Sequence, residues 1–209
     1  MLGFEKKFNL LKFHKFISVI LHPIVIPTIG VILFLLITPV EIKKERQYLL
    51  ISIVFFCTYV VPIISLIILK SLGFINSFQV ESIKERKIPL FIMLILFYIL
   101  GKFLINIPDF TELGMLFFGT NISLALIYLL FLIQIKSSLH IMSLSSALGF
   151  FLLYGNLHSK SVLPIAIVII LLTGVLASSR LQLKAHNHKE IYFGFFIGLI
   201  GQFIAHGLL

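Results

Sequence analysis

Residues 48–69, YLLISIVFFCTYVVPIISLIIL, are 22 residues without a charged side chain. An α-helix needs about 20 predominantly apolar residues to cross the hydrocarbon core of a bilayer. Inside lipid the backbone must satisfy its own hydrogen bonds, so a segment of this kind is expected to be helical. The stretch therefore predicts a transmembrane helix that ends at Lys70.

The rest of the chain repeats this pattern. Of the 209 residues, 59% are hydrophobic and 12% are charged, against about 45–50% and 25% in ordinary soluble domains. This composition excludes a typical water-soluble fold. Apolar runs predict seven spans, near residues 16–38, 48–70, 89–107, 112–135, 139–155, 162–178 and 190–207. We expect an all-α, polytopic membrane helix bundle of six or seven transmembrane helices, built as one domain over residues 1–209.

Three local signals refine this prediction. His22-Pro23 and Pro27 lie inside the first run and predict a kink or irregular turn there. Pro89 is expected in the first turn of the third helix, where its missing N–H costs little. The first run is too long for a cleaved signal sequence, so it is expected to be retained as a helix. The expected location is the bacterial inner (cytoplasmic) membrane.

The charge is strongly positive, with 17 Lys and Arg against 8 Asp and Glu. On a soluble protein this excess would suggest nucleic acid, but on so apolar a chain it favours lipid phosphates, and no nucleic-acid partner is expected. Seven crossings would place 12 of the cations on the side of the N-terminus, which the positive-inside rule assigns to the cytoplasm. Five of these 12 cations can belong to a binding site. Without them, the side of the N-terminus has seven Lys and Arg residues and the opposite side has five, so the orientation stays open.

The segment with the most chemical information is residues 178–194, SSRLQLKAHNHKEIYFG. If the last helix begins near His186, the i, i+4 spacing places His186 and Glu190 on one face. A carboxylate beside an imidazole fixes its tautomer, and the planar fork of Arg180 suits phosphate oxygens. A nucleophilic imidazole, an orienting acid and an anion-binding cation together favour phosphoryl transfer.

This spacing, Ser179-Arg180-x5-His186-x3-Glu190, resembles the third signature of the superfamily of type 2 phosphatidic acid phosphatases and vanadium haloperoxidases. That signature is Ser-Arg-x5-His-x3-Asp, so Glu190 replaces an aspartate. The glycines that follow are also similar to the family's last helix; they are Gly194, Gly198 and Gly201.

Two further segments resemble the other signatures of the superfamily. Ser138-Leu139-His140 stands where the family has Ser-Gly-His at the start of a helix, and Lys136 lies beside it. Lys84-Glu-Arg-Lys-Ile-Pro89 has the cations and proline of the first signature, Lys-x6-Arg-Pro, at a different spacing. The resemblance covers residues 81–201.

The resemblance implies a membrane lipid phosphatase that hydrolyses a phosphate monoester or diphosphate of a lipid through a phosphohistidine. His186 would be the nucleophile, Glu190 would orient its ring, and His140 would protonate the leaving oxygen. Neither a metal nor another cofactor is required. The implied phosphate-binding residues are Arg180, Lys84, Arg86, Lys87, Lys136 and Ser138. The alternative is a catalytically silent relative that binds or moves an anionic phospholipid, which the departures at Leu139, Glu190 and the first signature favour.

Several of these side chains also have simpler interpretations. His22 either lines the site or is a hydrogen-bonded core histidine, and Lys136 is either a phosphate ligand or a helix-end anchor. Glu190 can form an ion pair with Lys184 or Lys189. His188 is expected to be exposed to solvent, and His206 is expected to be structural.

Overall fold

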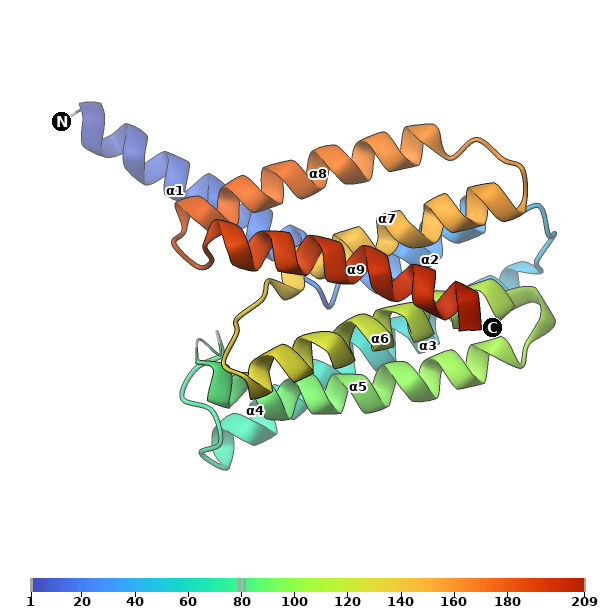
Figure 1. Ribbon diagram of the computed structural model, residues 1–209, viewed down its shortest axis with the longest axis horizontal. Helices are drawn as coiled ribbons and strands as arrows, with labels where there is room; N and C mark the ends of the chain where they lie inside the picture. Colours follow the sequence, from blue (N-terminus) through green and yellow to red (C-terminus); the bar gives the residue numbers. More distant parts are fainter. Residues whose placement is uncertain (1, 79, 81, 209) are drawn as a thin grey trace.

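The computed structural model describes residues 2–78, 80 and 82–208. These residues form a bundle of helices, and no strand occurs among them (Figure 1). The α-helices are α1 (Leu2–Ile20), α2 (Ile26–Ile37), α3 (Lys44–Phe55), α4 (Val61–Ser71), α5 (Ile83–Ile105), α6 (Thr111–Leu132), α7 (Leu139–Leu157), α8 (Leu163–Gln182) and α9 (His188–Leu208). The predicted all-α class is confirmed.

Six helical segments of the described chain are long and apolar enough to cross a membrane. The first of them joins α3 and α4 through a π-helical turn, Phe56–Val60, into one stretch over Lys44–Ser71. The other five contain α5, α6, α7, α8 and α9. The predicted multi-pass bundle is therefore confirmed, with six long apolar helices and the shorter α2 beside them.

The first predicted span is not a single helix. α1 ends at Ile20 and α2 begins at Ile26, so residues 21–25 interrupt the helix completely. Pro23 and Pro27 lack the backbone N–H that a continuous helix would need at these positions. With 12 residues, α2 is about 18 Å long, which is too short to cross a bilayer unaided.

The third span begins earlier than predicted. α5 begins at Ile83, because Ser82 caps it by accepting a hydrogen bond from the Glu85 N–H at 3.3 Å. Pro89 consequently lies inside the helix rather than in its first turn. The basic residues Lys84, Arg86 and Lys87 are therefore held on the first turns of a membrane helix and not in a loop.

Helix α7 is the centre of the bundle, and it packs most extensively against α9. Glycines on α9 allow this close approach, because a Cβ atom at Gly194 would lie 2.5 Å from the Ser138 carbonyl oxygen. A Cβ atom at Gly198 would collide with the Ser145 hydroxyl of α7. At the start of the two helices, the Ser138 N–H donates to the Glu190 carbonyl at 3.1 Å.

The connections that carry the predicted site share one end of the bundle. In Figure 1 the α4–α5, α6–α7 and α8–α9 connections lie at the left, near α1, and the C-terminus lies at the opposite end. At that opposite end Arg46 pairs with Asp109, and His158 Nε2 lies 2.7 Å from Glu112 Oε1. The three segments that carry the predicted site residues therefore lie at the same end of the bundle.

Candidate active site

His186 and Glu190 form the closest charged contact at this end. His186 Nδ1 lies 2.6 Å from Glu190 Oε2, and only 2% of the His186 side chain is exposed. An ionised carboxylate can only accept, so Nδ1 carries the proton and donates it. The second ring nitrogen, Nε2, is then left with a free lone pair, as nucleophilic attack requires.

This contact does not depend on the helix start that the sequence suggests. α9 begins at His188, so His186 precedes the helix. Asn187 caps it: its Oδ1 accepts the Glu190 N–H at 3.0 Å, and its Nδ2 donates to Glu190 Oε1 at 3.1 Å. The reciprocal cap fixes the carboxylate, which in turn holds the imidazole. No lysine takes part, so the ion pair of Glu190 with Lys184 or Lys189 is not observed among the described residues.

The surroundings keep His186 neutral. Burial and the positive charges of Arg180, Lys136 and Arg86 lower the pKa of His186 from 6.5 to about 3. Loss of hydration and nearby cations both disfavour the protonated ring. At neutral pH the imidazole therefore keeps the lone pair that a nucleophile needs.

Arg180 lies in the last turn of α8 and lines a cavity together with His186. Its Nε atom is buried and has no hydrogen-bond partner, and no carboxylate among the described residues pairs with it. A buried guanidinium without an acceptor is costly, in contrast to the paired Arg46 at the other end of the bundle. The unsatisfied donor therefore points to an anionic ligand in the cavity.

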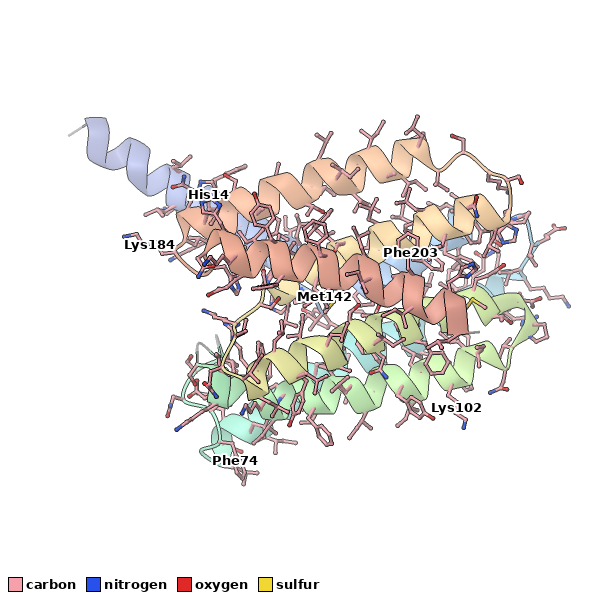
Figure 2. The ribbon with its side chains drawn as sticks, in the orientation of Figure 1. His14, Phe74, Lys102, Met142, Lys184 and Phe203 are labelled. Carbon is pink, nitrogen blue, oxygen red and sulfur yellow. The ribbon has the colours of Figure 1, made fainter. Side chains whose placement is uncertain are left out.

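The neighbour of Arg180 anchors the first helix. Ser179 Oγ donates to the Val175 carbonyl at 2.9 Å, so it accepts from His14 Nδ1 at 3.0 Å. Figure 2 shows His14 on α1 beside the end of α8, with Lys184 at the same end of the bundle. Within the Ser-Arg pair, Ser179 thus holds α1 in place while Arg180 lines the cavity.

Two histidines line the cavity from α7 and from the α1–α2 break. His140 is the second residue of α7, and His22 lies in the interruption between α1 and α2. Their ring centroids are 5.0 Å apart, with an angle of 78° between the planes. Of the two interpretations of His22, the structure supports a cavity-lining residue.

Of the three cations near the start of α5, Arg86 lines the cavity. Its Nε donates to the Val80 carbonyl at 2.7 Å, which fixes the stem of the side chain. Lys84 is exposed and Lys87 is half-buried, and neither lines the cavity. The early helix start explains the difference, because consecutive residues on a helix point in different directions.

Lys136 and Ser138 lie behind the cavity and not on its wall. Lys136 Nζ donates to the Ala185 carbonyl at 3.1 Å and so connects the α6–α7 and α8–α9 segments. Ser138 is completely buried, its hydroxyl has no hydrogen-bond partner, and its N–H binds the Glu190 carbonyl. In this arrangement both residues position the loop that carries His186.

The cavity has a volume of about 220 Å³ and two chemically different parts. Its charged and imidazole-bearing part is lined by His22, Arg86, His140, Arg180 and His186. Its apolar part reaches between α2, α5, α6 and α7, and includes Gly30, Phe97, Phe117, Leu124 and Phe151. An anionic head group with a hydrocarbon chain matches both parts.

The sequence motifs do not assign His22 or the apolar part of the cavity to the site. The signal for His22 is the His22-Pro23 pair, since proline marks the interruption that turns the ring toward the cavity. In the described part of the chain, no group of three or more His, Cys, Asp or Glu side chains is placed to hold a metal ion. His188, two residues after the candidate nucleophile, is exposed as predicted.

Comparison of the chain with family models, with curated proteins and with solved structures gives no match. A function for the chain therefore has to be inferred from the geometry of the site.

Proposed function

We propose that the protein is a membrane lipid phosphatase that hydrolyses a phosphate monoester or diphosphate of a lipid through a phosphohistidine. The observation that carries the proposal is the neutral, carboxylate-bound His186 in the same cavity as the unpaired guanidinium of Arg180. The first is suited to attack phosphorus, and the second is suited to bind the oxygens around it.

In the first step, Nε2 of His186 attacks phosphorus and forms a P–N bond. The bond from phosphorus to the leaving oxygen breaks, and its electron pair goes to that oxygen. His140 gives the oxygen its proton, so a lipid alcohol (or, from a diphosphate, a lipid monophosphate) leaves. Arg180 and Arg86 neutralise the charge on the phosphoryl oxygens during this step.

In the second step, water attacks the phosphohistidine. His140 takes a proton from the water, the P–N bond breaks, and inorganic phosphate leaves. His186 and His140 regain their starting protonation states, so the cycle consumes only water and substrate.

The apolar part of the cavity supports a lipid substrate. A water-soluble phosphate ester would use Arg86, Arg180 and His186 and leave the phenylalanine-lined part of the cavity unfilled. A hydrocarbon chain would fill this part and make van der Waals contacts with its wall.

The test is phosphate release from phosphatidic acid and from a polyprenyl diphosphate in detergent micelles, by wild-type protein and by His186→Ala. His188→Ala is the matched control, because this neighbouring histidine is exposed. We expect turnover by the wild type and the control, inhibition by vanadate, and loss of about 10³-fold or more in His186→Ala. Wild-type turnover by His186→Ala would contradict the proposal.

A second candidate function is binding or movement of an anionic phospholipid without hydrolysis. It is favoured by the position of Lys84 and Lys87 outside the cavity, which leaves Arg86 as the cation from that segment on the cavity wall. This candidate predicts that the wild type binds vesicles containing phosphatidic acid and releases no phosphate. Binding that depends on Arg180, without turnover, would favour it over the phosphatase.

A further inference from the structure

The break between α1 and α2 brings a third histidine to the cavity, for which the proposed mechanism has no role. His22 lies in residues 21–25, directly before Pro23, and it lines the cavity beside His140. It comes from the opposite end of the sequence to His186, and from an element outside the three motif segments.

The contact of His22 with His140 is specific in geometry. At 5.0 Å between centroids and 78° between planes, the edge of one ring faces the plane of the other, an arrangement that aromatic pairs prefer. The segment that follows α1 thus places an aromatic ring directly against His140.

His22 also closes a turn on its own backbone. Its Nδ1 accepts the Ile24 N–H at 3.4 Å, which assigns the proton of the neutral ring to Nε2. An asparagine side chain makes the same bond to the residue two positions on. The two contributions of His22 can therefore be tested separately. Asparagine at this position keeps the hydrogen bond that closes the turn, and phenylalanine keeps the aromatic ring.

The proposed general acid needs such a neighbour. His140 must be protonated when substrate is bound, although Arg86 and Arg180 line the same cavity and their charges oppose a further cation. A neutral neighbouring ring adds no further positive charge to the cavity. A ring in edge-to-face contact also restricts the orientations of its partner.

We propose that His22 is a positioning residue whose ring holds the His140 imidazole in place for proton transfer. The inference rests on the proposed phosphatase function. His22 keeps its own proton throughout, because His140 gives one proton to the leaving oxygen and recovers one from water.

The experiment compares kcat and KM of wild-type protein, His22→Asn and His22→Phe for phosphatidic acid in micelles. We expect His22→Phe to stay within about threefold of the wild-type kcat, because it preserves the ring. His22→Asn should lose about tenfold or more in kcat, with KM within about twofold, because a misplaced catalytic group slows the chemical step more than it weakens binding. If His22 only stabilised the turn, phenylalanine would not restore activity, because it cannot accept the Ile24 N–H. A loss confined to kcat, with KM unchanged, would not be expected either.

Thermal unfolding of each purified variant shows whether it is folded, and His22→Gln replaces the asparagine variant if that one does not fold. Wild-type kcat in folded His22→Asn overturns the inference, as does an equal loss in folded His22→Asn and folded His22→Phe, or a change confined to KM. If wild-type protein releases no phosphate, the proposed function fails and this inference fails with it. A working wild type with an equally active His22→Asn refutes the role of His22 alone.

Discussion

Glu190 accepts three hydrogen bonds close to the nucleophile, besides the bond that its N–H donates to Asn187. One carboxylate oxygen accepts from His186, the other accepts from Asn187, and the backbone carbonyl accepts from Ser138. Glutamine at this position has the same size and also suits a reciprocal helix cap. The substitution Glu190→Gln therefore removes the negative charge while preserving the shape of the loop.

We expect Glu190→Gln to lower kcat by about 10²–10⁴-fold, because the neutral amide no longer enforces the Nδ1–H tautomer or stabilises charge on the ring. Vanadate affinity should change little, since the residues that contact the anion are intact. The measurements are steady-state phosphate release and vanadate inhibition. Lys189→Gln, at an exposed neighbouring position, is the control, and equal rates for the two variants would contradict the role of Glu190.

The low pKa of His186 links stability to pH. In the unfolded chain the imidazole binds a proton below its ordinary pKa of 6.5, whereas in the folded chain it stays neutral down to about 3. The unfolded state therefore binds more protons between these values, and the folded state loses stability as the pH falls through this window.

This linkage predicts that His186→Asn is less sensitive to acid than wild-type protein. The difference in Tm between pH 7 and pH 4.5 should be smaller in the variant, because the variant lacks the group that takes up a proton on unfolding. Tm can be followed by the circular dichroism of the helices. A thiol-reactive dye at Cys57, which is free and partly buried, serves at neutral pH alone, because the dye reacts with the thiolate. An identical pH dependence in both proteins would show that His186 is protonated in the folded state.

At the scale of the elements, the packing of α7 against α9 depends on glycines of α9, because a larger side chain at these positions would hold the two helices apart. A Cβ atom at Gly198 would collide with the Ser145 hydroxyl and lie 2.5 Å from the Met142 carbonyl oxygen. Because backbone atoms cannot rotate away, the helices must separate to accept it. His186 and His140 are carried at the ends of this pair, so the separation also widens the site.

We expect Gly198→Ala to destabilise the protein by about 1–3 kcal/mol through overpacking, which lowers Tm by several degrees. Gly207→Ala, on the same helix but with no atom within 4 Å of its Cβ, is the matched control and should stay within about 0.5 kcal/mol of wild type. Thermal unfolding followed at Cys57 measures both. Equal Tm values would mean that the two helices repack without cost.

The elements could be predicted from hydropathy, because a membrane-spanning helix must be apolar along its whole length. The residues at which the helices begin and end could not be predicted from hydropathy, because they depend on capping side chains and prolines. Ser82 and Glu85 start α5 six residues before the apolar run at Pro89, and Asn187 starts α9 after His186 instead of before it. In both cases a polar side chain that binds backbone N–H groups outweighs hydropathy.

At the scale of the whole molecule, the cavity connects the polar end of the bundle with its apolar interior. Gly30 of α2 lines the apolar part, and a Cβ atom there would meet only Leu116 Cδ2, at 3.9 Å. A larger side chain at this position therefore enters the cavity and leaves the packing of the helices unchanged.

We expect Gly30→Leu to raise KM for long-chain lipid phosphates about tenfold, the effect of displacing about two methylene groups. Hydrolysis of a short, water-soluble phosphate ester should not change. Gly174→Leu is the control, since that glycine lies on the exposed face of α8 with open space around it. Initial rates with a series of chain lengths test the prediction, and a uniform loss for all lengths would contradict a chain-binding cavity.

The candidate site could be predicted in part. The spacing of Arg180, His186 and Glu190 predicts that they lie near one another, and His186 contacts Glu190, although His186 precedes α9 and does not lie on it. The direction of Lys84 and Lys87 depends on where α5 starts, and the contact of His22 depends on how α1 meets α8. Such long-range packing leaves little trace in local sequence.

The bond between His14 and Ser179 joins residues that are 165 positions apart. Because a ribosome delivers the chain from its N-terminus, α1 is synthesised first and must wait for α8 before it can dock. Until then His22 has no fixed place beside His140. Assembly of the site is therefore one of the last events in the biogenesis of this protein, and a nascent chain that stops before α8 contains α1–α7 but neither Arg180 nor His186.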